Sequence, residues 1–203
     1  MAGPAVDSSR ARLLASARTL FARLGYEQTP TSAIAREAGT SESQLVRSFG
    51  GKAGLLEAIF EESWRPINAR VKDLLTDARD GRAAVVAVLS TILAALDSDE
   101  DLATIFLFEG RRIRGESHQI NLSSGFVEFA DVVQRLIKRG QKDGSFAASF
   151  DPAALAAALT GAAEGMLRER VLARRGGGGR PYNDRQIQRV FEAMLGAFAP
   201  PRK

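Results

Sequence analysis

The chain has 203 residues, of which 45% are hydrophobic and 26% charged, so its composition predicts a globular protein with room for one large domain or two small ones. It has no cysteine and one histidine, which excludes disulfides and cysteine-ligated zinc and leaves too few ligands for a multi-histidine metal site. No apolar run approaches the roughly 20 residues that span a bilayer, and the N-terminal stretch lacks the pattern of a secretion signal. We therefore expect a cytoplasmic protein without a membrane partner.

The net charge of +4 is concentrated near the N-terminus. Residues 1–52 contain seven basic and four acidic side chains, whereas the remaining residues contain 21 basic and 20 acidic ones. This bias favours a polyanion as the partner of the N-terminal part. A chance scatter of surface arginines would give the same totals, so charge alone leaves both interpretations open.

The N-terminal quarter of the chain begins with an expected amphipathic helix. Apolar residues recur every three or four positions from about residue 8 to 24, and Gly25 is placed to end the helix. A short linker follows, in which Thr29 or Thr31 could cap a second helix with its side-chain oxygen.

The stretch 31–49, TSAIAREAGTSESQLVRSF, predicts two short helices that meet at a sharp turn. Gly39 stands where the first of them must end, because glycine enters the left-handed conformation at little cost. Ser41 can cap the next helix, and Leu45 and Phe49 are expected to anchor it inward. Its exposed side is expected to carry Glu42, Ser43, Gln44 and Arg47. A short polar helix braced by another helix suits a DNA major groove.

The rest of the chain also predicts helices. They are expected from about 52 to the middle seventies, from 83 to 96, onward from the acidic break at 97–101, around Phe126 to Ile137, from 152 to about 174 and from about 183 to 198. The sequence RDGR at 79–82 indicates a turn, and Asp151 followed by Pro152 indicates a helix start. Residues 115–124 are expected to form a connection, and no strand pattern stands out. The fold class is therefore all-α, with about nine helices.

Four sequence pieces in order resemble the DNA-binding domain of the TetR (tetracycline repressor) family of transcriptional regulators. They are LF…GY at 20–26, T…IA at 29–35, AGTS at 38–41 and L…F..K..L at 45–55, and the resemblance covers residues 9–60. It implies a helix-turn-helix DNA-binding domain of three helices at 1–52 and a larger helical ligand-binding and dimerisation domain at 53–203. The second part resembles the family only in length and helix count.

The resemblance makes residues 41–48 the recognition helix. The DNA contacts that it implies are Thr29, Thr31, Ser41, Ser43, Gln44, Arg47 and Lys52. Gln44 could reach adenine, Arg47 guanine or a phosphate, and Lys52 a phosphate. The alternative is that Thr29, Thr31 and Ser41 act only as helix caps. The chain departs from the family pattern at Val46 and Ser48, where members often carry aromatic residues that touch the DNA backbone.

The family's regulatory domain usually dimerises and holds a small molecule. Candidate effector contacts in this chain are Phe106, Glu109, Phe126, Phe129 and Met166, with Arg112 and His118 as further polar groups. The alternative for the aromatic residues is ordinary core packing. The last two helices are the candidate dimer interface, through Ala158, Gly161, Gly165, Phe191 and Met194. The alternative is that the small residues pack within one subunit.

These features together predict a dimeric, sequence-specific transcriptional regulator that binds a palindromic operator in double-stranded DNA. We expect a repressor that a small, mostly apolar ligand releases, with no cofactor, no metal and no enzymatic activity. One alternative is a DNA-binding regulator without a small-molecule effector. Another is a small helical enzyme, but the sequence offers it no nucleophile–base set. The run GGGG at 176–179 also lacks the lysine and hydroxyl residue of a phosphate-binding loop.

Overall fold

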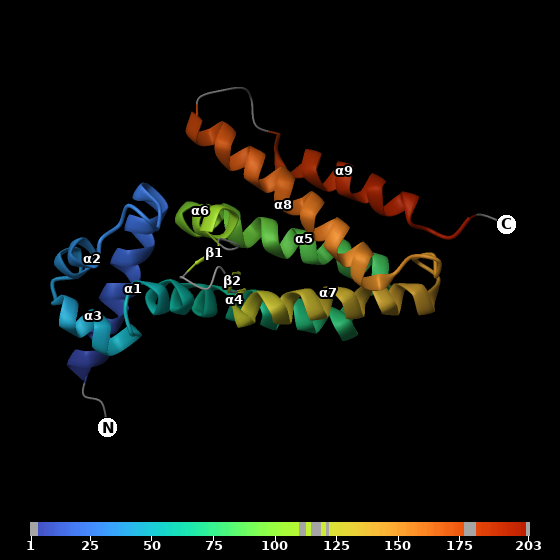
Figure 1. Ribbon diagram of the computed structural model, residues 1–203. Helices are drawn as coiled ribbons and strands as arrows, with labels where there is room; N and C mark the ends of the chain where they lie inside the picture. The colour runs from blue at the N-terminus through green and yellow to red at the C-terminus, as the bar shows by residue number, and fades with distance from the viewer. Residues whose placement is uncertain (1–3, 110–112, 115–118, 121, 177–181, 202–203) are drawn as a thin grey trace. The chain divides into compact units, whose positions relative to one another are not determined.

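The computed structural model describes residues 4–109, 113–114, 119–120, 122–176 and 182–201 (Figure 1). These residues form nine α-helices and one pair of two-residue strands, which confirms the predicted all-α class. Contacts divide the chain into two compact units, Met1–Ser63 with Asp99–Ser123 and Trp64–Ser98 with Ser124–Lys203. The functional boundary expected between residues 52 and 53 stays a prediction.

The first unit is built around the first helix. It holds α1 (Pro4–Leu24), α2 (Thr31–Glu37), α3 (Glu42–Phe49), α6 (Glu100–Glu109) and the start of α4 (Lys52–Asp77). Leu13, Ala17 and Phe21 recur every four residues along α1 and are fully buried. Helix α1 packs against α2, α3 and α6, so a helix that comes much later in the sequence belongs to the same unit as the first three.

Two very short strands lie between α6 and α7. β1 (Ile113–Arg114) pairs antiparallel with β2 (Gln119–Ile120), with Ile113 opposite Ile120. No alternating pattern in the sequence predicts this strand pair, because two residues are too few to show the alternation of a strand.

The second unit is a set of packed helices that continues from the later part of α4. It holds α5 (Gly81–Asp97), α7 (Ser124–Asp143), α8 (Pro152–Gly176) and α9 (Asp184–Ala197). Helix α5 packs against α7 and α9, and α8 packs against the same two helices (Figure 1). Helices α5 and α7 meet backbone to backbone at Gly81 and Gly140, where a Cβ on Gly81 would clash with the main chain of Gly140.

The helix starts of the second unit follow the capping signals in the sequence. Asp80 accepts a hydrogen bond of 2.7 Å from the N–H of Ala83 at the start of α5, and this bond holds the pKa of Asp80 below its usual range. Asp151 likewise accepts one of 2.8 Å from the N–H of Ala154, with Pro152 first in α8. The predicted start of α8 is confirmed, whereas α5 begins at Gly81 and not at residue 83 as expected, so part of the stretch predicted as a turn is helical.

Helices α4 and α7 are joined by an aromatic cluster within the second unit. The Trp64 ring lies 5.0 Å from Phe129 and 5.8 Å from Phe126, centroid to centroid. A Cβ on Gly125 would clash with Trp64, so the helices approach closely here. The buried amide of Asn68 donates hydrogen bonds of 2.8 Å to the carbonyl of Gly125 and 2.9 Å to Glu128 Oε2.

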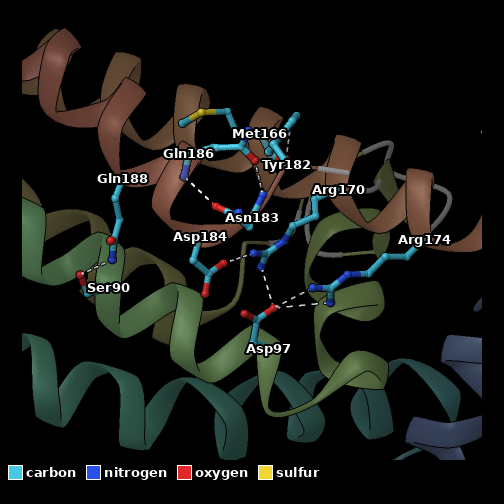
Figure 2. A network of polar contacts seen from close by, with 10 residues as sticks. All are labelled: Ser90, Asp97, Met166, Arg170, Arg174, Tyr182, Asn183, Asp184, Gln186 and Gln188. Atoms are coloured by element: carbon cyan, nitrogen blue, oxygen red, sulfur yellow. Dashed lines mark hydrogen bonds and ion pairs between the residues drawn. The ribbon is translucent and has the colours of Figure 1, made fainter. Parts of the chain in front are cut away.

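A buried arginine fixes the α8–α9 hairpin to the end of α5 (Figure 2). We call Arg170, Asp97, Asp184 and Arg174 the Arg170 centre. The guanidinium of Arg170 is 3% exposed and pairs with Asp97 Oδ1 at 2.8 Å and with Asp184 in the first turn of α9. Arg174 reaches the same oxygen of Asp97 at 3.5 Å. Burial and the adjacent Asp184 carboxyl raise the pKa of Asp97, and the two arginines oppose that shift.

Candidate nucleic-acid interface

The turn between α2 and α3 has the geometry that the sequence predicts. Gly39 adopts the left-handed conformation with φ of 61°, directly after Ala38 closes α2. Ser41 is extended and its Oγ accepts a hydrogen bond of 3.2 Å from the N–H of Gln44, which caps α3. The predicted positions of Gly39 and Ser41 at this turn are therefore confirmed.

Helix α3 has a buried side and an exposed side. Leu45 is fully buried, and Phe49 is half-buried beneath the guanidinium of Arg10, 4.5 Å from the ring centroid. The exposed positions of the helix are Glu42, Ser43, Val46 and Arg47. The face that α3 presents to solvent thus contains one cation, one anion, one hydroxyl group and one branched apolar side chain.

Several polar side chains of this region bond to one another. Ser41 Oγ and Ser43 Oγ are 2.9 Å apart, and Thr31 donates a hydrogen bond of 2.6 Å to Glu42 Oε2. Gln44, which we expected to be exposed, is half-buried and donates a hydrogen bond of 3.2 Å to Ser48 Oγ. An amide also has a second N–H and an acceptor oxygen, so Gln44 could contact a base while it keeps this bond.

Thr29 is a correction to the predicted contact set. The residue has no exposed surface, and its hydroxyl donates a hydrogen bond of 2.7 Å to the carbonyl of Gly25. It therefore braces the linker after α1 from inside and cannot touch a phosphate. The expectation that Thr29 or Thr31 caps α2 is also wrong, because Pro30 is the N-cap and no side chain bonds there.

Lys52, the predicted phosphate contact, also holds the α1–α2 linker. Its ammonium donates hydrogen bonds to the carbonyls of Tyr26 at 3.0 Å and Glu27 at 3.4 Å, and it lies 4.4 Å from the centroid of the Tyr26 ring. The N–H of Tyr26 in turn donates a hydrogen bond of 3.2 Å to Oε1 of the buried Glu109. An ammonium has three N–H groups, so a phosphate could share Lys52 with the two carbonyls.

Three arginines counted in the N-terminal charge bias have partners inside the first unit. Arg10 lies over Phe49, Arg12 donates a hydrogen bond of 2.9 Å to the carbonyl of Ala38, and Arg18 pairs with Asp99. Burial lowers the pKa of Arg18. Sequence reasoning missed these roles, since each partner lies far along the chain. The other arginines of the first three helices are Arg23, Arg36 and Arg47, and all three are exposed.

A family model described as bacterial regulatory proteins of the tetR family matches residues 13–59, from α1 through the start of α4. Residues 13–59 therefore carry the DNA-binding domain of the TetR family of transcriptional regulators. The chain is a DNA-binding regulator, as the sequence predicts.

Similar proteins extend the match beyond the DNA-binding unit. The HTH-type transcriptional repressor KstR2 of Rhodococcus jostii (strain RHA1) is 28% identical over 153 residues, 73% of this chain and 75% of the relative. The nucleoid occlusion factor SlmA of Aliivibrio fischeri (strain MJ11) is 29% identical over 172 residues, 81% of this chain and 85% of the relative. The structure of FadR from Bacillus subtilis in complex with stearoyl-CoA has a TM-score of 0.75 at 15% identity, covering 95% of this chain and 99% of that one, which shows a common fold.

The residues expected to contact an effector fall in different units. Phe106 is half-buried beside Phe60, and Glu109 is buried in the first unit. Phe126 and Phe129 belong to the aromatic cluster of the second unit, and Met166 accepts a hydrogen bond of 2.6 Å from Tyr182 at its carbonyl. Arg112 and His118 lie outside the described residues. The effector site stays a prediction.

The expected dimer residues of α8 and α9 differ in exposure. Ala158 and Gly161 are exposed, Gly165 and Met194 are half-buried, and an added Cβ on either glycine would meet nothing within 4 Å. Phe191 is buried in the core of its own subunit and is removed from the predicted interface. Leu172 on α8 and Val190 on α9 are exposed apolar residues that the prediction did not include.

No single helix in the described part of the chain has both the length and the apolar character that crossing a bilayer requires. Helices α5 and α6 pass this test of length and composition only as a bent pair.

Proposed function

We propose that the chain acts as a homodimeric repressor in the cytoplasm, and that the exposed face of α3 in each subunit meets one half of a palindromic operator. The observation that supports this most directly is Arg47, fully exposed on a helix that Ser41 caps and Leu45 anchors. A twofold dimer presents the same face twice, as repeated half-sites on a duplex require. Arg47 then contacts guanine or a phosphate in each half-site.

The remaining proposed contacts surround Arg47. Ser43 is exposed, and Ser41, Thr31 and Lys52 keep hydrogen-bonding capacity beyond the bonds that they make within the subunit. Gln44 contributes to base reading through the second N–H and the oxygen of its amide, while the bond to Ser48 orients that amide. These groups position the helix on the DNA, because contacts to phosphates fix register without reading sequence.

Helices α8 and α9 form the proposed dimer interface. Gly161 and Gly165 leave open space on α8, so a partner helix can approach closely, and exposed Val190 and Leu172 supply apolar area. Replacing Gly161 with leucine fills that space, and we expect it to shift the protein toward monomer in sedimentation analysis. A dimer that tolerates Gly161→Leu would contradict this interface.

A small, mostly apolar molecule is proposed to release the operator. Support comes from the fold shared with FadR of Bacillus subtilis, whose structure contains stearoyl-CoA, and from the aromatic residues around Trp64. Ligand would favour a spacing of the two α3 helices that no longer fits the operator. Stearoyl-CoA is the first probe to test, by thermal shift of the protein and by loss of operator binding.

Selection of bound sequences from random DNA tests the central proposal, and a palindromic consensus is the expected result. On the selected site, Arg47→Ala should weaken binding by about 5- to 150-fold, the equivalent of about 1–3 kcal/mol for a bidentate contact to guanine. Arg70→Ala is the matched control, because Arg70 is also exposed but lies on α4. Equal losses for both variants, or no selected sequence, would contradict the proposal.

A second candidate is a DNA-binding protein without a small effector. The 29% identity to a nucleoid occlusion factor across 81% of this chain keeps this candidate open. Such a protein would select a DNA sequence as above, but stearoyl-CoA and a broad panel of metabolites would change neither its melting temperature nor its operator affinity. Any ligand that changes both would favour the ligand-released repressor.

A further inference from the structure

Val46 is an apolar side chain on a surface that is otherwise polar. It is 55% exposed, more than any other large hydrophobic side chain among the described residues. It lies on the outer face of α3 between Ser43, one turn earlier, and its neighbour Arg47, and all three are exposed. Leu45 already provides the buried anchor of this helix. The fold of the subunit therefore gives Val46 no packing role.

Helix stability does not explain a valine at this position either. Branching at Cβ restricts the side chain in a helix, so valine is a weaker helix former than alanine. The same restriction holds its two methyl groups nearly fixed relative to the helix axis, so little side-chain entropy is lost when they contact a surface. A rigid pair of methyl groups on an exposed helix is suited to contact a small apolar feature.

The DNA major groove presents one such feature, the C5-methyl group of thymine. The charges and hydrogen-bonding groups around Val46 suit the remainder of that groove. Arg47 offers a guanidinium for guanine or phosphate, and Ser43 offers a hydroxyl group. Glu42, the exposed anion of this face, is held by the Thr31 hydroxyl at 2.6 Å.

We propose that Val46 is a specificity-determining residue that contacts the methyl group of one thymine in each operator half-site. The inference rests on the proposed function, since it requires α3 to enter the major groove. A contact of this kind changes how α3 is expected to recognise the bases. The base next to the Arg47 contact is read by apolar contact with Val46, while Gln44 remains bonded to Ser48.

Deoxyuridine provides a direct test because it lacks only the methyl group of thymidine and keeps every hydrogen-bonding group. Each dT of the selected operator is replaced by dU, one symmetric pair at a time, and binding is measured by titration at fixed salt. One of these symmetric pairs, the one that Val46 contacts, should weaken wild-type binding by about 15-fold. This is about fourfold for each half-site, because burial of one methyl group contributes about 0.8 kcal/mol. The other pairs should have little effect.

Val46→Ala links that effect to the side chain. The variant should fold, because alanine favours the helix and the Val46 side chain is 55% exposed, and it should bind the dT and dU forms of the operator equally. Val127→Ala is the matched control. Val127 is 48% exposed but lies on α7, so this variant should keep the full dU effect.

The outcomes separate the two levels of the argument. Failure to select any sequence would overturn DNA reading by α3 and the role of Val46 with it. A selected palindrome that tolerates dU at every position would overturn only the role of Val46. The same conclusion would follow if Val46→Ala kept the dU effect, since another group would then contact the methyl.

Discussion

The Arg170 centre allows a prediction about how two carboxylates share one buried cation. Asp97 and Asp184 have side chains 32% and 41% exposed, whereas Arg170 is only 3% exposed. The guanidinium therefore depends on the two carboxylates to balance its charge, while each carboxylate is also partly exposed to solvent. Replacing Asp97 with asparagine leaves Arg170 paired with Asp184, and Asp184→Asn leaves it paired with Asp97.

The expected costs follow from this asymmetry. Each single variant keeps one charged partner and loses the repulsion between the two carboxylates, so it should lower the free energy of unfolding by only about 1 kcal/mol. The double variant leaves a buried guanidinium without a counter-charge and should lose about 3–5 kcal/mol. The double loss should thus exceed the sum of the single losses by at least about 1 kcal/mol.

Trp64 provides the assay, because it is the only tryptophan of the chain and it is buried in the same unit. Its fluorescence during urea unfolding gives the free energy of unfolding of each variant. All variants are compared at one protomer concentration, because the stability of a dimer depends on concentration. Arg174→Ala is the control. Its side chain is 45% exposed, so the loss should be below about 0.5 kcal/mol. Additive losses in the double variant would refute the shared-cation argument.

Three further predictions concern stability in other parts of the chain. Gly125→Ala forces a Cβ against Trp64 and should lower the free energy of unfolding by about 1–3 kcal/mol, measured by urea unfolding. Thr29→Val should cost about 1–2 kcal/mol in the same assay by removing the bond to Gly25, with operator affinity unchanged. The lowered pKa of Asp80 means that its stabilising effect is present above its ordinary value of 3.8 and is lost as pH falls through the lowered pKa. Asp80→Asn should therefore flatten the loss of stability in that acid range, and an unchanged slope would contradict its role as the α5 cap.

The sequence predicted the DNA-binding unit well because its signals are local. Gly39 and Ser41 act on residues within one helical turn, and a glycine between two apolar patterns has few conformations that suit it. Leu45 is the inward anchor for the same reason, since helical spacing alone decides which side chains share a face. The same local logic identified Asp151 at the start of α8.

The role of each polar side chain could not be predicted in the same way. Some side chains are of the types that commonly contact DNA, yet each makes a hydrogen bond within the subunit, as Thr29, Gln44 and Lys52 do. Whether such a side chain faces solvent depends on carbonyl and hydroxyl groups that the fold brings near it. Sequence patterns report the apolar period of a helix but not the hydrogen-bond partners of its polar face.

Contacts between distant residues also decide which helices move as one body. The N–H of Tyr26 and the carboxylate of Glu109 are 83 positions apart, and Arg18 pairs with Asp99 across a similar span. The first contact joins α6 to the linker after α1, and the second joins α1 to the residue before α6, so α6 belongs to the compact unit that contains α3. A division read along the sequence assigns α6 to the effector domain, whereas packing assigns it to the DNA-binding unit. Any displacement of α6 would therefore act on the Tyr26 linker directly, because Glu109 and Lys52 hold that residue from opposite sides of its backbone.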